Sequence, residues 1–200
     1  MKKIIFVLSL LFVIGGCQQK QTTDAIKHKE VAVNNYEWFE KGVKNHVSKI
    51  SVLSEQPENI SHMAPEVLFG YANFLFLNEE KEKSVFVFYL AQLRARILLS
   101  VLKEETPLSI LYDEVLSALG PVINGWVGAY PDIWIEQMKA ALEYENSHPF
   151  SPHNLFSREE LVSEQEIEAA VKKQKEGLRE LITFVEENKD AILKHRQELN

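Results

Sequence analysis

The chain has 200 residues, of which 46% are hydrophobic, and this is enough for one domain with a buried core. Its formal net charge of −7 argues against a surface for nucleic acid, because such surfaces carry an excess of cations. Cys17 is the only cysteine, so an intramolecular disulfide is excluded and the domain must be held together by packing.

The N-terminus has the features of a secretory signal. Lys2 and Lys3 precede the apolar run Ile4–Ile14, which is too short to span a membrane as a mature helix. The run leads into Ile14-Gly15-Gly16-Cys17, which resembles the lipobox of bacterial lipoproteins. That resemblance implies a signal peptide over residues 1–16 and lipid attachment at Cys17. The alternative is a simple secretory peptide with an incidental cysteine.

The lipoprotein resemblance also implies a location. Acylation at Cys17 would anchor the chain to a membrane of the cell envelope. In enterobacterial lipoproteins an Asp after the cysteine retains the protein in the inner membrane, and Gln18 occupies that position here. The resemblance therefore implies the periplasmic side of the outer membrane, if the organism has two membranes.

Residues 17–29 are polar and predict a flexible tether, and residues 30–200 predict a single helical domain. A first helix is expected from about Glu30. Its apolar residues recur at spacings of three and four, and they are Tyr36, Phe39, Val43, Val47 and Ile50.

The stretch Ala64–Lys103 predicts two apolar helices joined by a charged turn. Pro65 suits a first helical turn, and Ser61 is a nearby candidate for the cap. The second helix, expected over Ser84–Lys103, is apolar on nearly all sides, which is typical of a central core helix. Val85 and its aromatic neighbours are also compatible with a strand, but the length of the segment favours a helix.

This helix pair resembles a single tetratricopeptide repeat. The matching residues are Leu68, Tyr71, Ala72 and Leu75 in the first helix, and Ser84, Phe88 and Ala91 in the second. A weaker match to the same pattern occurs over Trp134–Leu142. Repeat proteins need about three units to bury a continuous core, so an ordinary helical hairpin in an irregular bundle is the preferred interpretation.

Arg94 and Arg96 interrupt the apolar pattern of the second helix. They are two residues apart and point to different faces, so at least one is expected to lie against packed surface. A buried guanidinium requires a carboxylate, and the candidates are Asp113, Glu114 and Glu66. A salt bridge between helices is one interpretation of Arg94, and contact with a binding partner is the other.

The next helix is expected to begin with Thr106 as cap and Pro107 in the first turn, and to end at Gly120-Pro121. The stretch Gly120–Trp134 then combines three glycines, two prolines and three aromatic residues. It predicts either a tight connection packed by its own aromatics or a recognition loop. In the second case the partner-binding residues are Trp126, Tyr130 and Trp134.

A helix over Asp132–Glu145 leads to a proline-broken loop that contains His148 and His153. Glu143, Glu145 and His148 form an alternative acid and histidine site for an envelope enzyme. The spacing fits no HExxH motif, so no metal site is expected.

Two capping boxes follow, Ser157 with Glu160 and Ser163 with Glu166, and they predict a short helical turn and then a long C-terminal helix with a bend at Asn188. The apolar stripe of this helix can either dock on its own domain or seat a partner helix. Its residues are Ile167, Val171, Gln174, Leu178, Leu181, Ile182 and Val185.

The sequence therefore predicts an all-α fold, an irregular bundle of about six to eight helices. It contains no P-loop, no nucleophile elbow and no free nucleophilic cysteine, and no cofactor is expected. The first hypothesis is a lipid-anchored envelope protein that acts by protein–protein interaction, as an assembly factor, an adaptor or an immunity-type inhibitor. The alternatives are the envelope enzyme and a binder of a small apolar ligand.

Overall fold

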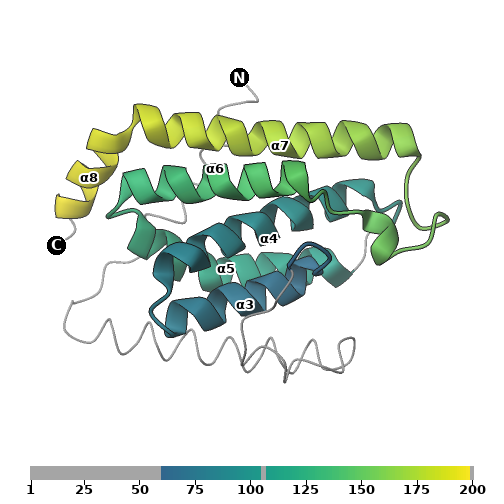
Figure 1. Ribbon diagram of the computed structural model, residues 1–200, viewed down its shortest axis with the longest axis horizontal. Helices are drawn as coiled ribbons and strands as arrows, with labels where there is room; N and C mark the ends of the chain where they lie inside the picture. The colour runs from purple at the N-terminus through teal and green to yellow at the C-terminus, as the bar shows by residue number, and fades with distance from the viewer. Residues whose placement is uncertain (1–59, 105–106, 199–200) are drawn as a thin grey trace.

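The computed structural model describes residues 60–104 and 107–198. Within them the chain forms six α-helices and no strand, so the predicted all-α bundle is confirmed (Figure 1). The predicted signal peptide, Cys17, the tether, the helix from Glu30 and the Thr106 cap lie outside the described residues. The helices are α3 (Pro65–Leu77), α4 (Lys81–Val101), α5 (Pro107–Val127), α6 (Pro131–Ser147), the 3₁₀ turn η2 (Pro152–Asn154), α7 (Glu164–Glu187) and α8 (Lys189–Glu198).

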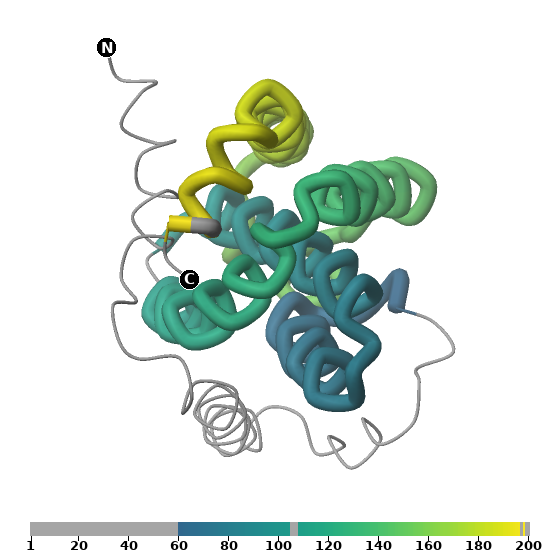
Figure 2. The backbone as a smooth tube through the Cα atoms, turned by 90° about the vertical axis from the view of Figure 1, so that its left-hand side faces the viewer, coloured from purple at the N-terminus to yellow at the C-terminus, as the bar shows by residue number. Residues whose placement is uncertain are grey.

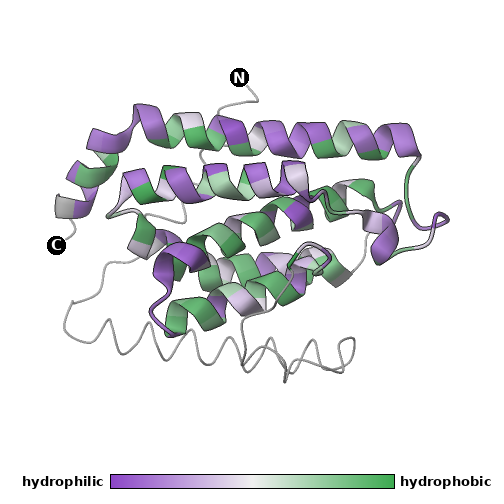
Figure 3. Ribbon diagram, viewed as in Figure 1, coloured by the Kyte–Doolittle hydropathy of each residue, from purple (hydrophilic) through white to green (hydrophobic). Residues whose placement is uncertain are grey.

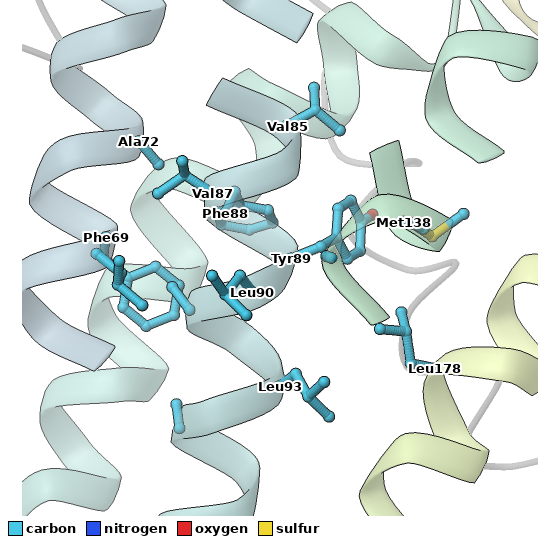
Figure 4. Close-up of a cluster of buried hydrophobic side chains, with 14 of the residues drawn as sticks. Phe69, Ala72, Val85, Val87, Phe88, Tyr89, Leu90, Leu93, Met138 and Leu178 are labelled. Atoms are coloured by element: carbon cyan, nitrogen blue, oxygen red, sulfur yellow. The ribbon is translucent and has the colours of Figure 1, made fainter. Parts of the chain in front are cut away.

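Helix α4 is the centre of the bundle and contacts α3, α5, α6 and α7. Viewed along the bundle, the other long helices surround it (Figure 2). Phe88 and Leu90 lie toward α3, while Tyr89 lies beside Met138 of α6 (Figure 4). Because α4 is covered on both sides, it must be apolar on nearly all faces. The prediction of a central core helix is confirmed, and the strand interpretation is wrong.

The composition of α4 would also suit a membrane span. Among the described helices it alone is long and apolar enough to cross a bilayer, but 78% of its most apolar window is buried inside the bundle. Burial against other helices imposes the same composition as burial in lipid. The apolar character of α4 is therefore accounted for by its central position.

Helices α3 and α4 form a hairpin with a short charged turn, as the sequence predicts. The Ser84 hydroxyl donates to the Ala72 carbonyl at 2.7 Å, so a small polar residue bridges the two helices where they approach closely. Glu79, in the turn, is the one described non-glycine residue with positive φ, at 65°. The N-cap of α3 is Ala64, which makes no side-chain cap bond, so the expected Ser61 cap is wrong.

Helix α5 continues through Pro121 to Val127 and does not end at Gly120-Pro121 as predicted. Proline removes one backbone donor, the one that would bond the carbonyl of Ser117 four residues earlier. Ser117 is on the exposed side of the helix, where water can satisfy that carbonyl. The packing of Val122, Ile123 and Val127 in the core then outweighs the lost bond.

Helix α7 docks on its own domain along the predicted stripe. It contacts α4 and α6, and its residues Ile167, Leu178, Ile182 and Val185 are buried. Its outer face is largely hydrophilic, in contrast to α3 (Figure 3). An isolated antiparallel bridge between Leu102 and Leu161 fixes the segment before α7 to the end of α4. The bend at Asn188 is confirmed, because Asn188 caps α7 and α8 follows it.

The two predicted capping boxes have different outcomes. Ser163 is the N-cap of α7, and both reciprocal bonds with Glu166 are present. Ser157 donates to Glu160 through its N–H and its hydroxyl, but the residues between them form a turn and no helix follows directly. The same sequence pattern therefore starts a helix in one place and closes a turn in the other.

We expect Ser163→Ala to lower the free energy of unfolding by about 1 kcal/mol, because the first turn of α7 loses its cap. Urea denaturation followed by circular dichroism measures the change. Ser157→Ala is the matched control, since it removes the same type of bond between a hydroxyl and a glutamate at a position where no helix begins. It should lower the free energy of unfolding by less. Equal effects of the two substitutions would contradict a specific role for the α7 cap.

Candidate functional site

Arg94 is a buried side chain that makes several hydrogen bonds to distant parts of the chain. It is fully buried, and its Nε donates to Oε2 of Glu145 at 2.8 Å. Its Nη1 donates to the Ile60 carbonyl at 2.9 Å, and its Nη2 donates to the His148 carbonyl at 3.2 Å. The guanidinium also lies 5.5 Å from the centre of the Phe150 ring. One cation thus joins four parts of the chain.

These contacts confirm a salt bridge between helices and correct its partner. Asp113 and Glu114 are exposed, and Glu66 accepts instead from the Tyr112 hydroxyl at 2.9 Å. A side chain with no exposed surface cannot contact another protein in this conformation, so the structure does not support Arg94 as a partner-binding residue. The arginine is a structural centre.

The acid and histidine set is brought together only in part. The Glu145 carboxylate is buried, with one oxygen accepting from Arg94 and the other from the Phe150 N–H at 2.8 Å. His148 is exposed and stacks on Tyr144 at 4.6 Å, and Glu143 is also exposed. Glu145 is therefore fully engaged in holding the fold. Over the described residues, no group of three potential metal ligands gathers.

Trp134 belongs to a second polar group inside the core. It is only 3% exposed, and its indole N–H donates to the Tyr89 hydroxyl at 2.7 Å. That hydroxyl donates in turn to Oδ1 of Asn124 at 3.0 Å. Burial raises the pKa of Tyr89 well above its usual range, so the hydroxyl stays protonated. The chain links α6, α4 and α5, and Trp134 is unavailable to a partner.

Trp126 and Tyr130 form a surface at the opposite end of α4 from the Arg94 contacts. Their ring centres are 5.1 Å apart, and Trp126 also makes an edge contact with Phe76 at 6.5 Å. Lys81 lies 5.6 Å above the Phe76 ring. We call Phe76, Trp126 and Tyr130 the aromatic patch. Its residues lie near the ends of α3 and α5 and at the start of α6.

Exposure within the aromatic patch is graded. Tyr130 is 48% exposed, while Trp126 and Phe76 are partly buried against the core. The charged residues beside the patch are paired with one another, Glu79 with Lys81 and Asp132 with Lys189. Because these pairs neutralise each other, the patch offers aromatic surface without a strong local charge.

The structure thus separates the four residues expected to bind a partner. Trp126 and Tyr130 come together at the surface, whereas Trp134 and Arg94 are buried. Phe76 was not predicted for this surface, and its position in an apolar helix gives no signal that would single it out. The role of Glu145 was also missed, since nothing in the sequence links it to an arginine 51 residues away.

Comparisons of the chain with protein-family models, with curated proteins and with solved structures find no match. The tetratricopeptide resemblance therefore rests on one helix pair.

We expect Arg94→Met to lower the free energy of unfolding by about 3–5 kcal/mol, because the Glu145 carboxylate stays buried without its cation. Denaturant unfolding of the purified variant measures this loss. The double variant Arg94→Met with Glu145→Leu should recover part of it, since no buried charge is left unpaired. A single variant as stable as the parent would contradict the central position given to this pair.

Proposed function

We propose that this protein is a lipid-anchored component of the bacterial cell envelope that binds a protein partner through the aromatic patch. The observation that carries the binding half of the proposal is the exposure of Tyr130 on a support of Trp126 and Phe76. Tyrosine and tryptophan are enriched among the residues that contribute most to protein–protein binding. A single exposed apolar residue would carry no such argument.

The support beneath Tyr130 favours binding for a second reason. The patch is built on helix ends that pack against the core, so its side chains lose little conformational freedom when a partner binds. Tyr130 is the N-cap residue of α6, and its carbonyl accepts a hydrogen bond from the backbone N–H of Trp134 at 3.0 Å. An ordered aromatic surface of this kind is what a binding protein requires.

The anchoring half of the proposal rests on the sequence alone. The lipobox-like segment Ile14–Cys17 implies acylation, and the polar stretch that follows implies a tether between lipid and domain. A tethered domain is held near other envelope proteins, which raises their effective concentration and makes a modest interface sufficient.

The envelope enzyme is a weaker candidate, because Glu145 already bonds Arg94 and Phe150 with both carboxylate oxygens. Glu145 is also only 1% exposed, so a substrate cannot reach its carboxylate in this conformation.

We expect Tyr130→Ala combined with Trp126→Ala to abolish recovery of a stoichiometric partner. The measurement is crosslinking in the native cells followed by purification of the full-length protein at high salt. Ile110→Ala is the control, because Ile110 is 64% exposed on α5 but does not belong to the patch. A partner retained by the double variant, or lost equally in the control, would contradict the assignment of the patch.

We expect Cys17→Ser to move the protein from the membrane fraction to the soluble fraction of the cell envelope, because no acyl chain can be attached. Fractionation with detection by antibody measures the distribution, and mass spectrometry of the mature parent protein measures the added lipid. A serine variant that remains in the membrane fraction would contradict anchoring at this residue.

A further inference from the structure

Helix α7 carries a groove that the proposed function does not use. Its volume is about 360 Å³, and the described residues that line it all belong to α7. They are Ile167, Glu168, Val171, Lys172, Lys175 and Arg179. The groove is shallow and largely open to solvent, and its volume is of the order that a small molecule fills.

The lining has two chemical parts. Ile167 is buried and Val171 is half-buried, so together they offer an apolar side. Lys172, Lys175 and Arg179 follow along the same face at spacings of three and four, which places them one above another on the helix. Glu168 is the one acid of the described lining, so cations outnumber acids there.

The three cations are incompletely satisfied by the protein. Lys172 makes no hydrogen bond or ion pair with the described residues. Lys175 makes one long bond, from its Nζ to the Glu145 carbonyl at 3.3 Å. Arg179 pairs with Glu176 at 3.1 Å, an exposed pair of the kind that contributes little. Each therefore retains donor capacity for an incoming anion.

The distribution of charge along α7 decides which anion fits. The helix carries seven acids, at positions 164, 166, 168, 176, 180, 186 and 187, and only four cations, at 172, 173, 175 and 179. An extended anionic surface, such as a membrane, would meet acids at both ends of the cation cluster and be repelled. A single anionic group would meet the three cations, with Glu168 and Glu176 as the acids beside them.

We propose that the α7 groove binds a small amphiphilic anion, with one carboxylate or phosphate head group on a short apolar chain. The head group would bind Lys172, Lys175 and Arg179 by charge-assisted hydrogen bonds. The chain would lie along Ile167 and Val171. This site shares no residue with the aromatic patch, so the inference does not depend on the proposed partner binding.

The test is an NMR titration of residues 17–200, with Cys17→Ser so that no acyl chain is present. The probes are octanoate and octyl phosphate, with octanol as the neutral match and inorganic phosphate as the anion without a chain. We expect saturable shifts of the α7 amides over residues 167–179 with an amphiphilic anion. The stronger of the two anions identifies the head group.

Two neighbouring lysines give a matched pair of variants. Lys172→Gln and Lys173→Gln each remove one exposed positive charge from the same turn of α7, but only Lys172 lines the groove. We expect Lys172→Gln to weaken octanoate binding by about two- to fivefold, and Lys173→Gln to leave it nearly unchanged. Equal weakening by both variants, equal binding of octanol or phosphate, or no saturable shift would each overturn the proposal.

Discussion

A buried positive charge on α4 determines how the described part of the chain is arranged. Removing a guanidinium from water costs several kcal/mol unless its donors are paired. Hydrogen bonds to one carboxylate and to carbonyl groups of two separate segments offset this cost for Arg94. The two segments are residues 60–63 and His148. The segment before α3, the end of α6 and the loop after it must therefore meet at one point. Hydrophobic packing alone would leave their relative positions much less defined.

A second polar group fixes the same helix closer to its start. The Tyr89 hydroxyl accepts from Trp134 and donates to Asn124, so one hydroxyl sets the distance of α4 from both α5 and α6. Non-directional apolar contacts tolerate small slips between helices, whereas these bonds do not. The aromatic patch lies on the helix ends that this group positions, since Trp126 and Tyr130 lie within a few residues of Asn124 and Trp134.

Periodicity in the sequence was sufficient to predict most of the helices. The spacing of apolar residues is a local property, and it marks α3, α4, α6 and α7 without knowledge of the fold. The predicted end of α5 was wrong. Pro121 is a local signal for a helix end, but the helix continues because the residues after it pack against distant parts of the chain. Ser157 shows the converse. The Glu160 carboxylate bonds Ser157 as in a capping box, but the Glu160 N–H donates to the Ser157 carbonyl, and a turn forms without a helix directly after it.

The candidate site could be predicted only to the level of a segment. Trp126 and Trp134 lie in the same aromatic stretch, eight residues apart, and no local pattern shows which of them is buried. Trp134 is the buried one, because the Tyr89 hydroxyl accepts a hydrogen bond from its indole N–H inside the core. Likewise, Arg94 was expected to pair within α3 or α5, but its carboxylate comes from α6. Pairings between distant segments are properties of the assembled bundle.

Glu145 connects the core to the outer surface of the bundle. Its carboxylate binds Arg94 and the Phe150 N–H, while its backbone carbonyl accepts from Lys175 of α7. Desolvation lowers the pKa of Lys175, and the nearby Glu145 charge opposes that effect. One residue at the end of α6 thus neutralises the buried arginine and also accepts a hydrogen bond from a lysine of α7. The carboxylate of Glu145 therefore serves the packing of α4 against α6, and its carbonyl serves the packing of α6 against α7.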